Sequence, residues 1–460
     1  MSPVSLTVER IGGASLRRFP ELVSHVILRD PALVFRRVYV VSADQDITDR
    51  LLENTKTGKG GVHARLSQQT DYRSALRALG QHLLGINQAL GRFGLDVAVA
   101  DDFIGKRIEA VYGALDSVSH LLASGYVTRQ ELLSAAREAL ASIGDAHAAF
   151  NAAWLLRARG CPAQFVDLSG WGEAREPHLD DRIRDTLARY DPRTNVLLVT
   201  GYCKGIEGVM REVDRDYADL VFAKMAVILG AEQAVLHGDH ALRSGDPAVV
   251  GADSVRSVRH INFDVAEQLA DIGRSVLHAR ATELLDRAGV ALRINNAFSS
   301  EDDSTLVTKD YVCPEASIEV VAGTDKVSLL EVYDAGMVGE VGADHQLTEV
   351  LARHRVSYIG KSTNANTIDV IVWERDVRPE LVAELRTLFA SVELRPVALV
   401  CAIGSNIARP GVLARAAGVL AESGVNIVSI GQTARQTNIQ FAVSREDLVT
   451  AQRALHAAGH

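Results

Sequence analysis

The chain has 460 residues, 47% of them hydrophobic and 23% charged, with a formal net charge of −9. This length exceeds one ordinary hydrophobic core and favours two to four domains. The acidic excess is spread along the chain, which argues against a nucleic-acid footprint and against a polybasic membrane surface.

The cysteine pattern and the hydropathy pattern exclude further classes. The four cysteines are far apart and form no CxxC pair: Cys161, Cys203, Cys313 and Cys401. This spacing argues against a disulfide framework or a structural zinc site and fits a reducing compartment. Glu9 and Arg10 interrupt any apolar signal core, and no run of 18 apolar residues occurs. We therefore expect a cytoplasmic protein with no membrane and no nucleic-acid partner.

The first 300 residues alternate short β-branched runs with helical stretches. The predicted strands are residues 5–11, 37–41, 96–98, 163–167, 195–200, 234–237 and 291–295. The clearest helical periodicity covers residues 72–93, 128–156 and 219–230. This alternation is typical of an α/β domain with a mainly parallel sheet sandwiched by helices, in which ligands sit at the carboxyl ends of the strands.

The pattern changes near Ser299, where a polar, charged stretch predicts a loop near a domain edge. Two shorter units of similar order follow. The first has strand 317–322, helix 346–354 and strand 356–359, and the second has strand 397–403, helix 410–423 and strand 426–430. We interpret them as an internal duplication of a small β-α-β unit. The predicted domains are residues 1–300, 316–390 and 396–460.

The first candidate site segment is residues 8–15 (Val-Glu-Arg-Ile-Gly-Gly-Ala-Ser), where a strand runs into a glycine pair and then a helix. Gly12 and Gly13 allow backbone N–H groups to approach a phosphate, and the helix N-terminus favours negative charge. Arg10 can neutralise a transferring phosphoryl group. The alternative is a plain strand-to-helix turn.

The second segment, residues 40–49, follows a strong strand and carries Ser42 and Thr48. Both hydroxyls can bind a substrate carboxylate or a phosphate. The alternative is a βα loop whose polar side chains cap a helix.

The third and fourth segments also follow predicted strands. Residues 201–208 contain three glycines and lead to Arg215 and Asp219, which suggests close backbone approach to a ligand, or else a mobile surface loop. Asp239 and the Gly-Asp-Pro turn at Asp246 can line a nucleotide pocket, or can serve only as turn residues. His278 lies in an apolar stretch, and we interpret it as a core histidine.

In this combination and order, the segments resemble the aspartate kinase family of the amino-acid-kinase superfamily, most closely the subgroup associated with ectoine biosynthesis. The likeness covers nearly the whole chain. The matching segments are residues 10–15, 40–49, 144–145, the glycine-rich stretch before residue 215, and residues 245–247, 276–278, 293–296, 361–367 and 409–412. The last two resemble the ACT domains of that family.

The resemblance implies an amino-acid-kinase fold followed by two ferredoxin-like ACT domains, and an amino-acid-biosynthetic kinase. It implies ATP-dependent phosphorylation of the L-aspartate β-carboxylate, with Mg²⁺ bridging the phosphates. The implied catalytic residues are Arg10 and Asp219. The implied substrate-binding residues are Ser42, Thr48, Asp145 and Arg215. The implied nucleotide-binding residues are Gly12, Gly13, Asp239 and Asp246, and no residue is assigned as a metal ligand.

Several positions depart from the family pattern, mostly where phosphate and substrate would bind. Arg10 and Ala14 replace a lysine and a threonine, and Asp145 replaces a glutamate. Asp46 and Asp216 replace glycines, and a carboxylate near a polyanion costs Coulomb energy unless a cation offsets it. Ala218, Gly238 and Ser275 also depart from the pattern. Three possibilities follow: an ordinary aspartate kinase, a kinase for a related amino-acid carboxylate, or a degenerate, non-catalytic amino-acid sensor.

The ACT resemblance implies an amino-acid effector and pairing of chains into a homodimer. The candidate regulatory residues are Asp325, in a predicted loop at residues 325–329, Met337 in the segment 337–339, Asn364 and Asn366. The alternative is that these residues only cap helices and pair subunits.

Overall fold

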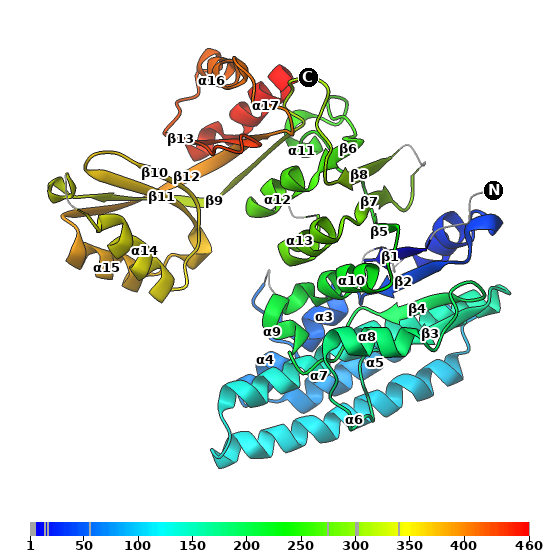
Figure 1. Cartoon of the computed structure of the whole chain (residues 1–460). Helices are drawn as coiled ribbons and strands as arrows, with labels where there is room; N and C mark the ends of the chain where they lie inside the picture. The colour runs from blue at the N-terminus through cyan, green and yellow to red at the C-terminus, as the bar shows by residue number, and fades with distance from the viewer. Residues whose placement is uncertain are drawn as a thin grey trace. The chain divides into compact units, whose positions relative to one another are not determined.

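The computed structural model describes residues 6–12, 15, 18–54, 57–273, 276–299, 303–338 and 341–459 (Figure 1). The chain splits into two compact units. Unit 1 comprises Met1–Ala241 and Leu277–Leu306, and unit 2 comprises Leu242–Val276 and Val307–His460. Among the described residues, no helix is both long enough and apolar enough to cross a bilayer. The domain limits predicted at residues 300, 316–390 and 396–460 stay a prediction.

Unit 1 is built on a mainly parallel sheet, as the sequence predicts. Its strands run in the order β3-β4-β2-β1-β5-β7-β8, and every neighbouring pair from β3 to β7 is parallel. The strands are β1 (Thr7–Ile11), β2 (Arg37–Val41), β3 (Ala163–Val166), β4 (Val196–Thr200), β5 (Gln233–Gly238), β7 (Ala291–Asn296) and β8 (Ser304–Thr308). The carboxyl ends of β1, β2, β4 and β5 therefore lie along one edge of the sheet, which positions the candidate site.

The helices of unit 1 pack on both faces of this sheet. One face carries a core in which Ile11, Tyr39 and Val41 pack with residues of α2 and α7, and α10 lies against β1 through the opposite side of that strand. The helices are α2 (Phe19–Leu22), α3 (Gln45–Leu51), α4 (Val62–Ser67), α5 (Tyr72–Gly91), α6 (Val97–Ser124), α7 (Arg129–Ala158), α8 (Leu179–Leu187), α9 (Val209–Val213), α10 (Tyr217–Ile228) and α13 (Ala279–Ala288). Short helical turns cover η1 (Val23–Ile27), η2 (Pro31–Leu33) and η3 (Asp214–Asp216).

The strand predicted at residues 96–98 is wrong, because these residues begin α6. The Asp96 side chain accepts a hydrogen bond from the backbone N–H of Val99, at 3.2 Å, and so caps the helix. Ala100, Ile104 and Val111 are buried along one face. This helical spacing continues for seven turns and outweighs the β propensity of two valines.

Unit 2 contains an antiparallel six-stranded sheet in the order β10-β11-β9-β12-β14-β13. Its strands are β9 (Val320–Tyr333), β10 (Tyr358–Thr363), β11 (Thr367–Trp373), β12 (Ser391–Ile403), β13 (Ser429–Gln432) and β14 (Asn438–Val443). Helices α14 (Ala343–Arg353) and α15 (Pro379–Leu388) cover one core, and α16 (Val412–Glu422) and α17 (Leu448–Gly459) cover a second. The predicted succession of a parallel α/β domain and ACT-type units is confirmed.

The long strands β9 and β12 join the two ACT-type cores into one sheet. Each strand contributes one half to each core: Leu330 and Val392 belong to the core covered by α14 and α15, and Val321 and Val400 belong to the core covered by α16 and α17. The loop predicted at residues 325–329 is therefore wrong. Asp325 lies inside β9, where the register with β12 shifts between Val397 and Leu399. A β-bulge of this kind accommodates polar residues within a strand, which is why the sequence here resembles that of a loop.

Residues 242–276 form part of unit 2. They contain α11 (Pro247–Val250), β6 (His260–Asn262) and α12 (Phe263–Asp271). Ser244 Oγ lies 2.9 Å from His456 Nε2, and Arg453 Nε donates to the Val249 carbonyl at 2.7 Å. The segment is thereby attached to α17.

Candidate functional site

The carboxyl ends of β2 and β4 meet one residue of α7, Asp145. This side chain is fully buried, and its Oδ1 accepts a hydrogen bond from the Ala43 backbone N–H at 2.7 Å. A Cβ atom on Gly201 would lie 2.8 Å from Asp145 Oδ2, so glycine is needed where β4 ends. The structure thus brings the segment containing Ser42 and the glycine-rich segment together around one carboxyl group.

The Asp145 carboxyl has a raised pKa and one oxygen atom without a hydrogen-bond partner among the described residues. Burial raises its pKa to about 7, although the Ala43 N–H and the positive charge of Arg10 both act to lower it. The hydroxyl of Tyr217 lies 3.5 Å from Oδ1, whereas Oδ2 is buried with no partner among the described residues. The Ser42 hydroxyl is likewise buried without a partner. Buried polar atoms of this kind are rare unless a ligand or water satisfies them.

Arg10 and Asp219, the two predicted catalytic residues, form an ion pair across the interface between β1 and α10. The second oxygen of Asp219 accepts a hydrogen bond from the His278 backbone N–H at 2.7 Å. The Arg10 side chain keeps 18% of its surface exposed, so it can reach a ligand. The interpretation of His278 as a core residue is wrong: it is half-buried, and its Nδ1 accepts from the Arg280 N–H as the N-cap of α13.

Asp216 lies close to this ion pair. Burial and the negative charge of Asp219 raise its pKa, while His278 and Arg10 act to lower it. A second carboxyl group is therefore present at the edge where the sequence predicts a polyanion. Such a carboxylate is tolerated beside phosphates when a cation lies between them.

The guanidinium of Arg215 is held at the end of α3. Its Nη1 donates to the Glu53 carbonyl at 2.6 Å, and its Nη2 lies 2.5 Å from Asp49 Oδ1. Asp49 follows Thr48, whose hydroxyl donates to the Asp44 carbonyl within α3 at 3.4 Å. Arg215 and Thr48 are thus brought to the same segment, and the side chain of Arg215 remains 16% exposed.

Asp46 is one of the two carboxylates whose negative charge the sequence places near a polyanion. In the structure its carboxylate bonds to Arg50 Nε at 2.9 Å and lies 3.3 Å from His82 Nε2. The negative charge is therefore offset within the protein by its own helical neighbour.

The remaining predicted nucleotide residues are more scattered. Gly12 directly follows β1, and Gly13 lies outside the described residues, as do Ala14 and Ser275. Asp239 is exposed directly after β5 in unit 1. Asp246 belongs to unit 2, where its side chain caps α11 by accepting from the Ala248 N–H at 2.9 Å.

Two of the predicted regulatory residues lie near Asp334. The Asp334 N–H donates to the Asn366 carbonyl at 3.0 Å, and its side chain caps the short helix η4 (Ala335–Met337). Asn364 closes the turn between β10 and β11, because its N–H donates to the Thr367 carbonyl at 2.8 Å. Asp325 lies eight strand positions from Tyr333, roughly 26 Å along β9, so it is not part of this group.

One site residue was missed in the sequence. Glu138 is a half-buried acid on α7 that accepts from the Tyr202 hydroxyl at 2.7 Å and from the Met210 N–H at 2.8 Å. It lies seven residues before Asp145, which is two helical turns and the same face. The sequence signal that could have found Glu138 is this spacing, which places it on the same helical face as Asp145.

Replacing Gly144 with alanine is expected to lower the free energy of unfolding by about 1–3 kcal/mol through overpacking. A Cβ there would lie 2.7 Å from Ala43 Cβ and 3.0 Å from Ile47 Cγ2. The matched control is Gly113→Ala in α6, where nothing lies within 4 Å and alanine should stabilise the helix by up to about 1 kcal/mol. Urea denaturation of both variants measures the difference, and equal stability of the two would contradict this packing.

Comparison of the sequence with known protein families and proteins identifies relatives of the chain. The model of the amino acid kinase family matches residues 5–296, and an ACT domain model matches residues 400–458. The protein "Aspartate kinase Ask_Ect" of Stutzerimonas stutzeri (strain A1501) is 36% identical over 460 residues, which cover 98% of this chain and 97% of that protein. This relative fits the subgroup expected from the sequence.

The fold is also that of solved aspartokinases. Escherichia coli aspartokinase III in complex with aspartate and ADP (R-state) superposes with a TM-score of 0.73 at 21% identity, over 98% of this chain and 99% of that one. The same enzyme in complex with lysine and aspartate (T-state) gives a TM-score of 0.74 at 21% identity, over 99% of both chains. The relative from Stutzerimonas stutzeri matches nearly the whole chain, and the amino acid kinase model matches residues 5–296. The chain therefore belongs to the aspartate kinase family.

Proposed function

We propose that the chain transfers the γ-phosphoryl group of ATP to the β-carboxylate of L-aspartate, giving 4-phospho-L-aspartate and ADP. The observation that carries the proposal is the convergence of a buried carboxyl with an open oxygen, Asp145, and a cation, Arg10, at one edge of the sheet. Support comes from the full-length relative that bears the name aspartate kinase and from the E. coli structure that holds aspartate and ADP.

The proposed roles follow from charge. Asp145, once ionised, binds the α-ammonium group of aspartate, and Ser42 donates to one of its carboxylates. Arg215 provides the cation that holds the substrate carboxylate, while Thr48 supports the same segment. These contacts hold the β-carboxylate oxygen in line with the γ-phosphorus, so that a P–O bond forms as the bond to ADP breaks.

Arg10 neutralises charge that develops on the transferring group, and Asp219 fixes the orientation of its guanidinium. No covalent intermediate with the enzyme is needed. Gly12, Gly13, Asp239 and Asp246 are the proposed nucleotide-binding residues.

Mg²⁺ fits this edge of the sheet. Magnesium in kinases is commonly held by substrate phosphates, waters and one or two carboxylates, and no group of three or more potential ligands occurs within the described ranges. Asp216, which lies within electrostatic reach of Arg10 and Asp219 at this edge, is the carboxylate that we propose to hold such a cation. When bound, the ion would neutralise the phosphate oxygens.

The test is ATP-dependent formation of the hydroxamate from a panel of amino acids. Aspartate is expected to give the product and glutamate or asparagine little or none. Preference for another amino-acid carboxylate would assign the chain to a related substrate. Absence of any nucleotide binding would favour the non-catalytic sensor, for which the replacement of lysine by Arg10 and of glycine by Asp46 and Asp216 is the motivating observation.

The group formed by Asp334, Met337 and Asn366 is the proposed effector site of the ACT-type unit, for an amino acid bound where two chains pair as a homodimer. The support is the short capped helix beside the β10–β11 turn, together with the E. coli relative whose structure contains lysine. Titration of activity with lysine and threonine tests it.

A further inference from the structure

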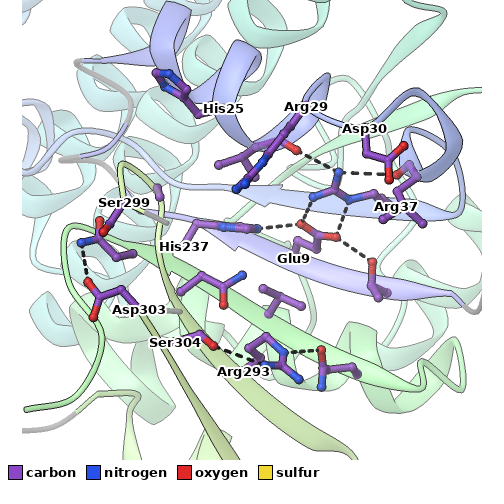
Figure 2. Close-up of a pocket in the computed structure, with 18 residues that line it drawn as sticks. Glu9, His25, Arg29, Asp30, Arg37, His237, Arg293, Ser299, Asp303 and Ser304 are labelled. Atoms are coloured by element: carbon purple, nitrogen blue, oxygen red, sulfur yellow. Dashed lines mark hydrogen bonds and ion pairs between the residues drawn. The ribbon is translucent and has the colours of Figure 1, made fainter. Parts of the chain in front are cut away.

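A second cavity lies in unit 1, on the face of the sheet opposite to that of Arg10 and Asp219, and none of the proposed site residues is among its described lining (Figure 2). It has a volume of about 640 Å³. Alternate residues of β1, β5 and β7 form its floor, and residues 25–33 form part of its rim. Because alternate side chains of a strand point to opposite faces, Glu9 faces this cavity while Arg10 faces α10. The cavity is therefore distinct from the candidate active site.

The floor of the cavity is a fixed charge network centred on Glu9. Its carboxylate accepts hydrogen bonds from Arg37 Nε at 2.6 Å and Nη2 at 2.7 Å, from His237 Nε2 at 2.7 Å and from the Thr7 hydroxyl at 2.7 Å. Burial acts to raise the pKa of Glu9, but Arg37 and His237 together hold it far below its usual range. Glu9 is therefore a permanent anion that Arg37 neutralises.

His237 adds an unsatisfied group to this floor. Its side chain is 3% exposed, and with Nε2 bonded to Glu9 its Nδ1 is buried without a partner in the described part of the chain. In a neutral imidazole whose Nε2 is the donor, Nδ1 is an acceptor, and a buried acceptor left without a donor costs free energy. A water or a ligand N–H that entered from the cavity would remove that cost.

The β7 wall offers a cationic fork and a carboxamide. Arg293 Nε donates to Gln233 Oε1 at 3.0 Å and Nη1 to the Ser304 hydroxyl at 3.3 Å, as the dashed lines in Figure 2 show. These bonds fix the guanidinium plane, and no described residue takes its Nη2. Asn295 lies two positions along the same face and forms no side-chain hydrogen bond within the described ranges. Fixed donors of this type suit a carboxylate.

The charged side chains that line the cavity favour a ligand that carries both a positive and a negative charge. Among the described residues, three arginines and three carboxylates line the cavity: Arg29, Arg37, Arg293, Glu9, Asp30 and Asp303. A nucleotide or another polyanion would meet three negative charges there. A zwitterion matches both signs, with its carboxylate on the Arg293 side and its ammonium group toward the carboxylates. Val26, Leu33 and Val235 add apolar surface for a side chain.

We propose that this cavity binds a free α-amino acid, as a second small-molecule site of the kinase unit. The carboxylate of the ligand would be held by Arg293 and Asn295, and its N–H donors would face the His237–Glu9 floor. The volume is within the usual range for small-molecule sites and leaves room for a long side chain and bound water. The proposal does not depend on phosphoryl transfer.

The test is a thermal-shift screen of the full chain against the twenty L-amino acids, followed by calorimetry of each one that shifts the transition. At least one amino acid is expected to bind at a site whose affinity falls tenfold or more in Arg293→Met and in Asn295→Leu. Two variants are used because Arg293 also links β5 to β8, whereas Asn295 has no such bond, and circular dichroism checks that each is folded.

Three controls separate this site from the others. Arg287→Met removes an exposed arginine of α13, paired with Glu283, and should leave binding unchanged. The binding that falls tenfold in the two cavity variants should keep its wild-type affinity in Arg215→Ala, which removes the proposed substrate cation. It should also keep that affinity in Asn366→Ala, at the proposed ACT effector site. The proposal is overturned if Arg293→Met and Asn295→Leu both leave the affinity for every bound amino acid unchanged. It is also overturned if Arg215→Ala or Asn366→Ala abolishes the binding of every amino acid that the wild type binds.

Discussion

Replacing Arg215 with alanine is expected to abolish measurable phosphorylation of aspartate, a fall in kcat/KM of about 10³-fold or more. The guanidinium is held in place before any ligand binds, by Asp49 Oδ1 at 2.5 Å and by the Glu53 carbonyl at 2.6 Å. These two bonds use two of its five N–H donors, so donors remain for a substrate carboxylate. A cation fixed in this way loses little entropy when the substrate binds.

A steady-state coupled assay for ADP release, with ATP and aspartate varied, measures the effect. The matched control is Arg137→Ala. Arg137 is shielded to a similar degree, with 18% of its side chain exposed against 16% for Arg215, and it pairs with Glu53 and Asp214 in the same region. It lies outside the matched motif, so its loss should lower thermal stability while kcat/KM stays within about tenfold. If Arg215→Ala still turns over, the assignment of the substrate cation is wrong.

The sequence predicted elements with strong periodicity well. The helix predicted at residues 72–93 is α5, Tyr72–Gly91, and the one predicted at residues 128–156 is α7, Arg129–Ala158. Six of the seven predicted strands of the first 300 residues correspond to strands of the parallel sheet. Buried parallel strands give continuous β-branched runs, which is why they are visible in the sequence.

The prediction failed where local preference and tertiary context disagree. Residues 325–329 carry turn-type polarity, but they lie inside β9 because β12 pairs with the strand on both sides of the bulge, at Thr324 and Val327, and β11 pairs with it from Val327 onward. A β-bulge presents polar residues within a strand, and nothing in the local pattern distinguishes it from a loop. The helix α6 was missed for a related reason, since its first residues are rich in valine.

In the candidate site, the sequence predicted residues that belong to local motifs but not the contacts between residues that are distant along the chain. Arg10 and Asp219 were both chosen from their motifs, and the structure pairs them. The contact of Asp145 with the Ala43 N–H joins residues 102 positions apart, and that of His237 with Glu9 joins residues 228 positions apart. Such contacts depend on the order of strands in the sheet, which a single sequence does not encode locally.

The state of the Asp145 carboxyl leads to the prediction with the largest dependence on pH. Its pKa is raised by burial from 3.8 to about 7. Below about pH 4 this group is protonated in both the folded and the unfolded chain, so it costs no stability. As the pH rises toward 7 the unfolded chain ionises first, and stability is lost until the folded carboxyl also ionises. Above pH 7 the loss is constant, at about 4 kcal/mol.

Asp145→Asn should therefore match the wild type in unfolding free energy near pH 4 and exceed it by about 4 kcal/mol at pH 8. The amide oxygen can still accept from the Ala43 N–H, so the local geometry is kept. Chemical denaturation of both proteins at pH 4, 6 and 8 measures the difference, and the comparison cancels every other titrating group. A difference that does not change with pH would show that the pKa of Asp145 is the same in the folded and the unfolded chain, and would contradict the prediction.

The same substitution should remove activity while it adds stability, because only the carboxylate can bind the ammonium group of aspartate. In the wild type, kcat/KM for aspartate should rise with pH through about 7, the pKa of the group in the free enzyme. In Asp145→Asn that limb should be absent and the residual rate low at every pH. Asp145→Glu, which keeps the charge, should restore the limb at a different pKa. A variant that gained stability at pH 8 yet kept the rising limb would place the substrate's ammonium group at another carboxylate, with Glu138, two turns earlier on α7, as the first to examine.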